Sequence, residues 1–153
     1  MTNKLSWEEY FIKIAKLVAE RSSCSRPAKG AVIVKDKMII STGYNGTPRG
    51  IKNCNEGGCA VCNEPERAKK SGTKLGECIC VHAEENAIIQ AAYQGVSTKG
   101  AILFSSFCPC LYCAKSIINA GIVKVYYNKA YAMDDRTIAL FKEAGVELVK
   151  YED

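Results

Sequence analysis

The chain has 153 residues, a length typical of one domain with a substantial hydrophobic core. It contains no low-complexity run, internal repeat, secretory signal or apolar stretch long enough for a bilayer, so we expect a single cytoplasmic domain over residues 1–153. The net charge of +5 is spread along the chain and never forms a basic block. This distribution suits a solvated mixed-charge surface, although it could also help to attract a phosphorylated substrate.

The N-terminal third predicts a helix, a hairpin and a loop. Residues 5–21 have an amphipathic pattern behind a Ser6 N-cap, and their apolar face is Phe11, Ile14, Ala15, Leu17 and Val18. The β-prone runs at 31–34 and 38–43 flank a short turn and predict a hairpin. A glycine-rich loop follows at 43–50. Its Asn45 could donate to and accept from a sugar hydroxyl or a base edge, although a plain turn is the simpler interpretation.

Cysteines dominate the next segment, which we expect to be a zinc-stapled insertion at about residues 53–80. Nine cysteines in a reducing compartment argue for metal binding rather than disulfides, and an odd number cannot pair completely within one chain. Cys59 and Cys62 have the C-x-x-C spacing of a zinc knuckle. A structural zinc would take four of six candidates, and the spacing does not decide which four: Cys24, Cys54, Cys59, Cys62, Cys78 and Cys80.

The remainder alternates helices and strands. Helices are predicted at 81–94, 110–120 and from Asp134 or Asp135 to 143, and strands at 101–105, 122–127 and 146–149. Together with the hairpin, this alternation predicts a layered α/β domain with a mixed sheet.

Two short motifs stand at the starts of the first two of these helices. His82, Cys110 and Cys113 offer three zinc ligands and leave a fourth position open, which distinguishes a catalytic zinc from a closed structural one. Glu84 is placed to carry protons beside the metal. This H-x-E…P-C-x-x-C pattern is typical of zinc-dependent nucleobase deaminases. The alternative, a packed His and an ordinary acid at a helix start, is disfavoured because both motifs occur together. Cys108 is expected to be a small buried residue.

The chain resembles the deoxycytidylate (dCMP) deaminase family of the cytidine-deaminase-like fold. The resemblance covers most of the chain, and its cysteine-rich form is similar to the fungal-type and competence-operon branches. The segments that carry it are 43–48, 53–54, 57–62, 80–87 and 108–113. It implies a three-layer α/β/α fold with a five-stranded mixed sheet.

The resemblance also implies an activity, namely hydrolysis of dCMP to dUMP and ammonia, which supplies thymidylate synthesis. It implies His82, Cys110 and Cys113 on a catalytic zinc, Glu84 as proton shuttle and Asn45 on the deoxyribose. Many members of the family are hexamers that are activated by dCTP with Mg²⁺ and inhibited by dTTP. A second zinc often lies near the positions of Cys24 and Cys54.

The segment before the hairpin departs from the family pattern. Residues 27–31 read Pro-Ala-Lys-Gly-Ala where a basic residue usually precedes Val-Gly-Ala. Arg26 remains a candidate for the substrate phosphate, with a plain surface charge as the equal alternative. Tyr131 lies where the family places a phosphate-binding tyrosine, and packing would explain it equally well.

Two other functions compete with this interpretation. A polynucleotide deaminase acting on tRNA or single-stranded DNA shares the metal motif, but would want a basic groove with stacking aromatics. A non-catalytic, zinc-stapled interaction module would have no use for Glu84. Whether dCTP is an effector, a substrate or both is left open by the residues.

Overall fold

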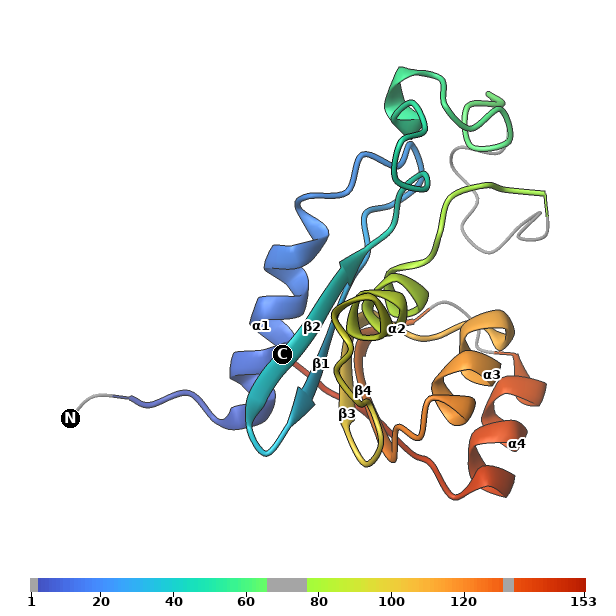
Figure 1. Cartoon of the computed structure of the whole chain (residues 1–153). Helices are drawn as coiled ribbons and strands as arrows, with labels where there is room; N and C mark the ends of the chain where they lie inside the picture. The colour runs from blue at the N-terminus through green and yellow to red at the C-terminus, as the bar shows by residue number, and fades with distance from the viewer. Residues whose placement is uncertain (1–2, 66–76, 131–133) are drawn as a thin grey trace.

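The computed structural model of the protein describes residues 3–65, 77–130 and 134–153 (Figure 1). Five strands form one mixed sheet in the order β2-β1-β3-β4-β5. The pairs β1–β2 and β1–β3 are antiparallel, whereas β3–β4 and β4–β5 are parallel. The strands are β1 (Gly30–Lys35), β2 (Met38–Tyr44), β3 (Ile102–Phe107), β4 (Lys124–Lys129) and β5 (Glu147–Lys150).

Helices cover both faces of this sheet, which confirms the expected three layers. Figure 1 shows α1 on one side and the other three helices on the opposite side. Their bounds are α1 (Trp7–Ala19), α2 (Ala83–Gln94), α3 (Leu111–Asn119) and α4 (Asp135–Ala144), and a short 3₁₀ turn spans Cys54–Glu56. Among the described helices, none is long and apolar enough to cross a bilayer.

Strand β1 lies at the centre of two cores because its side chains alternate between the two faces. Ala31 and Ile33 pack with α2, α3 and α4, whereas Val32 and Val34 pack with α1 and Phe104. All four are buried, as expected for a strand that is covered on both sides.

The predicted N-cap of α1 is confirmed, because the Ser6 hydroxyl accepts a hydrogen bond from the Glu9 N–H at 3.1 Å. Part of the predicted apolar face is wrong. Leu17 is 63% exposed, whereas Ile12, which the pattern did not select, is 1% exposed. Only some of the apolar side chains of α1 face the sheet. The buried ones are Phe11, Ile12, Ala15 and Ala19.

Helices α2 and α3 each begin later than predicted, for the same reason. His82 and Cys110 have extended backbones and are N-cap residues, so the helices start at Ala83 and Leu111. The predicted starts at residues 81 and 110 are therefore corrected. His82 and Cys110 occupy equivalent positions at the ends of two helices.

Close backbone contact seats α2 on the edge strand β2. A Cβ added to Gly43 would lie 2.3 Å from the Ala83 carbonyl oxygen and 2.3 Å from the Ala87 nitrogen. Only a glycine permits this approach, which brings the first turn of α2 down onto the sheet.

We predict that Gly43→Ala lowers the free energy of unfolding by about 1–3 kcal/mol or more, because α2 must move away from β2. Gly46→Ala is the matched control, since its nearest neighbour would be the Ser23 hydroxyl at 3.8 Å. Chemical denaturation of both variants measures the difference. Equal stabilities would contradict the importance of this contact.

Candidate active site

The N-termini of α2 and α3 meet near the carboxyl end of β3. Val81, which precedes the His82 cap, forms a two-way backbone bridge with Gly46, with N···O distances of 2.7 and 3.2 Å. On the other side, the Cys108 N–H donates to the Lys129 carbonyl at 2.8 Å and directs the chain from β3 into α3. These backbone bonds place the two cap residues face to face.

Three potential metal ligands converge at this point. The Nδ1 atom of His82 lies 3.3 Å from the Cys113 sulfur and 3.4 Å from the Cys110 sulfur. All three ligand atoms lie within 4.8 Å of one another. A tetrahedral zinc with ordinary Zn–S and Zn–N bonds separates its ligands by about 3.5–3.8 Å, so these residues fit one such ion.

The surroundings of Cys110 favour its deprotonated form, which is the form that binds a metal cation. The neighbouring Cys113 thiol, followed by His82, lowers the pKa of Cys110 to about 4, against the effect of burial. The hydrogen bond to Cys110 in turn raises the pKa of His82, and Cys110, burial and Glu84 raise that of Cys113. A thiolate is therefore present at neutral pH, and the positive ends of two helices help to stabilise it.

Glu84 lies at the second position of α2, only 3% exposed. Its Oε1 accepts a hydrogen bond from the Ser105 hydroxyl at 2.9 Å. Its carboxylate also faces the Cys113 sulfur closely enough to contribute to the raised pKa of that thiol. The acid therefore lies directly beside the three ligands, with one carboxylate oxygen anchored by Ser105.

Comparison with known proteins identifies this arrangement. The profile of the cytidine and deoxycytidylate deaminase zinc-binding region matches residues 5–129. The chain belongs to this deaminase family. The motif that resembled the family in sequence is thus the motif that assembles the three ligands and Glu84.

Several relatives in this family are similar over nearly the whole chain. Deoxycytidylate deaminase of Schizosaccharomyces pombe is 47% identical over 95% of this chain and 44% of its own length. ComE operon protein 2 of Bacillus subtilis is 39% identical over 97% of this chain and 73% of its own. The chain spans less than half the length of the fungal relatives it matches.

A solved structure shares the fold. The dCMP deaminase of cyanophage S-TIM5, in complex with dCMP and dUMP, is 33% identical and superimposes with a TM-score of 0.79, covering 98% of this chain and 100% of that one. This match confirms the cytidine-deaminase-like fold that the sequence resemblance implied.

Among the predicted substrate contacts, Asn45 binds the protein's own backbone. It is 7% exposed, its Oδ1 accepts from the Lys29 N–H at 2.8 Å, and its Nδ2 donates to the Pro27 carbonyl at 3.2 Å. Asn45 therefore positions the 27–29 segment. Arg26, just before that segment, is 8% exposed. Tyr131 lies outside the described residues.

Sequence reasoning missed Ser105 and Lys29. The Lys29 ammonium lies 4.5 Å from the centre of the Phe107 ring and close enough to His82 to oppose the rise in the pKa of the imidazole. No local pattern distinguishes either residue. The only hint to Lys29 was that the resembled family usually has a basic residue near this segment, and here the sequence departs from that pattern.

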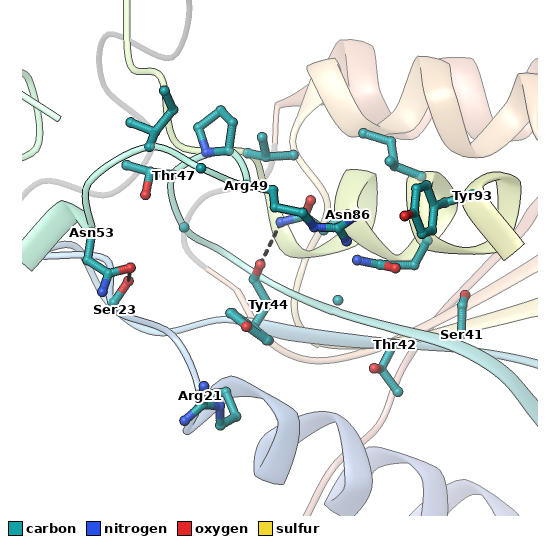
Figure 2. A pocket seen from close by; sticks show the side chains of 18 of the residues that line it. Arg21, Ser23, Ser41, Thr42, Tyr44, Thr47, Arg49, Asn53, Asn86 and Tyr93 are labelled. Atoms are coloured by element: carbon teal, nitrogen blue, oxygen red, sulfur yellow. Dashed lines mark hydrogen bonds between the residues drawn. The ribbon is translucent and has the colours of Figure 1, made fainter. Parts of the chain in front are cut away.

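A groove, separate from the three ligands, lies between the 46–51 loop and the outer face of α2 (Figure 2). Its volume is about 800 Å³. The Asn86 amide donates to the Tyr44 carbonyl at 2.8 Å, and the Arg49 guanidinium lies 4.7 Å from the centre of the Tyr93 ring. Arg21 and Asn53 also line this groove.

We predict that Ser105→Ala lowers the turnover of a cytosine nucleotide by about 10- to 100-fold, because a buried bond to a charged acceptor is worth about 1.5–3 kcal/mol. The loss should appear in kcat with little change in KM, since Ser105 orients Glu84 rather than the substrate. Steady-state ammonia release measures both constants.

Ser41→Ala provides the matched control for Ser105→Ala. Its buried hydroxyl donates to the Ala87 carbonyl of the same helix at 2.8 Å, away from Glu84. It should lower stability and leave kcat unchanged. If both variants lost kcat equally, Ser105 would act only through packing.

Proposed function

We propose that this chain hydrolyses dCMP to dUMP and ammonia. The convergence of His82, Cys110 and Cys113 beside the buried Glu84 carboxylate carries the proposal. The names of its relatives support the substrate. The deoxycytidylate deaminases of Schizosaccharomyces pombe and Saccharomyces cerevisiae are 47% and 41% identical to the chain, and the cyanophage enzyme was solved with dCMP and dUMP.

The three ligands would hold a zinc ion, which when bound lowers the pKa of a water molecule toward neutrality. Glu84 takes one proton from the attacking water and gives it to N3 of the cytosine ring as the C4–O bond forms. It then takes the second proton from that oxygen and gives it to the amino group, which leaves as ammonia when the C4–N bond breaks and C4=O remains. Because Ser105 occupies Oε1, the other carboxylate oxygen serves as the proton-carrying atom.

Burial of Glu84 is important for both proton transfers. A carboxylate that is 3% exposed does not exchange its proton freely with bulk water, so the proton is kept for the substrate. The N-termini of α2 and α3 offset the charge of two thiolates, which would otherwise weaken the effect of the metal on the water.

We propose Arg26, Lys29, Asn45 and Tyr131 as the substrate-binding group. Lys29 lies close enough to His82 to affect the pKa of the imidazole, and Arg26 is three residues before Lys29 in the chain, so that both could supply positive charge for the phosphate of a nucleotide. The bonds of Asn45 to the 27–29 segment use one lone pair of Oδ1 and one hydrogen of Nδ2. We propose that the remaining lone pair and hydrogen hold the deoxyribose. Tyr131 is proposed from the resemblance alone.

We predict that Glu84→Gln lowers the rate of dCMP deamination by about 10²- to 10⁴-fold, because Gln keeps the shape but carries no proton. Glu85→Gln is the matched control, since it neutralises the next acid of the same helical turn. Zinc content should be the same in both variants. A Glu84→Gln enzyme within tenfold of wild type would contradict the mechanism.

The substrate is tested by turnover of dCMP, dCTP, cytidine and deoxycytidine side by side. The proposal expects dCMP to be the best substrate. Preferential turnover of a cytosine-containing oligonucleotide would instead identify a polynucleotide deaminase, and turnover of dCTP would extend the substrate range to the triphosphate.

We also propose that dCTP with Mg²⁺ activates the enzyme, that dTTP inhibits it, and that the protein is a cytoplasmic homo-hexamer. None of the nine cysteines, all of which lie in the described residues, forms a disulfide, which suits a reducing compartment. The groove of about 800 Å³ suits a nucleotide in size, and Arg49 and Arg21 offer charge for its phosphates.

We predict that Arg49→Ala raises the dCTP concentration needed for half-maximal activation by about tenfold or more, because a charged phosphate contact is lost. Arg136→Ala, which removes an exposed arginine of α4, is the control. Initial rates over a dCTP titration, with the assembly state followed by light scattering, measure the effect. If the Arg49→Ala variant and the wild-type protein gave the same dCTP titration, the effector would bind outside this groove.

A further inference from the structure

All six candidate cysteines, five from the insertion and Cys24 from upstream, lie in one cluster, although only four were expected to bind a metal. They come from three separate stretches, around residues 24, 54–62 and 78–80. Four of them, Cys54, Cys59, Cys62 and Cys80, are buried. No disulfide joins any of them.

The sulfurs form two overlapping groups of four. In one group, Cys24 and Cys54 accompany Cys62 and Cys80, and in the other, Cys59 and Cys78 accompany the same two residues. Within each group all four sulfurs lie within 4.8 Å of one another. Cys62 and Cys80 thus belong to both groups, and their sulfurs are 3.8 Å apart.

Most of these sulfur–sulfur distances are close to the edge of a zinc tetrahedron, and the Cys62–Cys78 distance is shorter. An ordinary Zn–S bond of about 2.3 Å gives a sulfur–sulfur edge of about 3.8 Å. In the first group, Cys24 lies 3.9, 3.8 and 3.9 Å from Cys62, Cys80 and Cys54. In the second, Cys78 lies 3.6 Å from Cys59 and 3.2 Å from Cys62.

We propose that these six cysteines hold two zinc ions in one binuclear cluster, in which the Cys62 and Cys80 thiolates bridge the ions. Cys24 and Cys54 complete one tetrahedron, and Cys59 and Cys78 complete the other. The cluster is separate from the site at His82, so it does not depend on the proposed function.

A single zinc ion would bind only four of the six sulfurs and leave two buried or half-buried thiols without a metal. An ion on the first group would leave Cys59, which is 1% exposed, and Cys78 as thiols at ligand distance from bound sulfurs. An ion on the second group would leave Cys54, which is 0% exposed. Two tetrahedra that share an edge use every sulfur.

The charge balance also allows two ions. Six thiolates with two divalent ions carry the same net charge as four thiolates with one, so the second ion adds no further charge to a buried site. Backbone groups disperse that charge over the outer sulfurs. The Ser25 N–H donates to the Cys54 sulfur at 3.3 Å, and backbone groups of Arg26, Ile79 and Cys80 bond to Cys24, Cys59 and Cys78.

The surrounding chain holds the cluster in shape. The Asn63 side chain donates to the carbonyls of Cys54 and Cys59, both at 2.7 Å, and so ties two of the contributing turns together. Cys80 is two residues before His82, with the Val81 bridge between them. The cluster therefore also anchors the start of α2.

We predict about three zinc ions per wild-type chain by native mass spectrometry and elemental analysis, one at His82 and two in the cluster. The double variant Cys59→Ser/Cys78→Ser should lose one ion and keep the others. Cys108→Ala is the control, because Cys108 is a buried cysteine outside both groups, and it should keep all three.

A second measurement does not depend on how any variant folds. Wild-type protein loaded with ¹¹³Cd should show two cluster resonances that couple to each other through the bridging sulfurs. Two metal ions per wild-type chain, uncoupled cadmium signals, or a double variant with unchanged zinc would each overturn the binuclear cluster in favour of one four-cysteine site. A mass lowered by disulfide formation in freshly purified protein would overturn it as well.

Discussion

Two helices have to begin at the same place for His82, Cys110 and Cys113 to face one another. Helix α2 reaches this place because Gly43 lets its first turn rest directly on β2. Helix α3 reaches it because it follows β3, which lies two strands from β2 in the sheet. The geometry of the three potential ligands therefore depends on backbone packing at the edge of the sheet. His82 and Cys110 are placed by helix caps and Cys113 by the first turn of α3.

The same arrangement explains how so much negative charge is tolerated inside the protein. Two cysteine sulfurs and the Glu84 carboxylate lie within one buried region. This charge is compensated by the positive ends of α2 and α3, the Ser105 hydroxyl and the nearby Lys29 ammonium. A zinc ion on the three ligands would compensate for it further. The proton transfers proposed for Glu84 would thus take place where water has largely been replaced by fixed protein dipoles.

The cysteine cluster and the candidate active site are mechanically connected through a short rigid segment. Cys80 belongs to the cluster, Val81 is bridged to Gly46, and His82 caps α2. The irregular residues of the insertion have few apolar side chains with which to form a core, so in the proposed cluster metal–thiolate bonds would replace hydrophobic packing. The same bonds would fix the backbone that leads to His82.

The sequence by itself determined the types of element, the Ser6 cap and the ligand motifs. The Ser6 cap, the β-prone run at 31–34 and the H-x-E and P-C-x-x-C spacings act over a few residues, so local chemistry suffices to recognise them. Only the tertiary structure decided that Ser105 anchors Glu84, that Asn45 holds the 27–29 segment, and that Cys62 and Cys80 belong to both sulfur groups. These contacts join residues that are far apart along the chain, and spacing within an irregular loop carries no information about the distances between side chains in space.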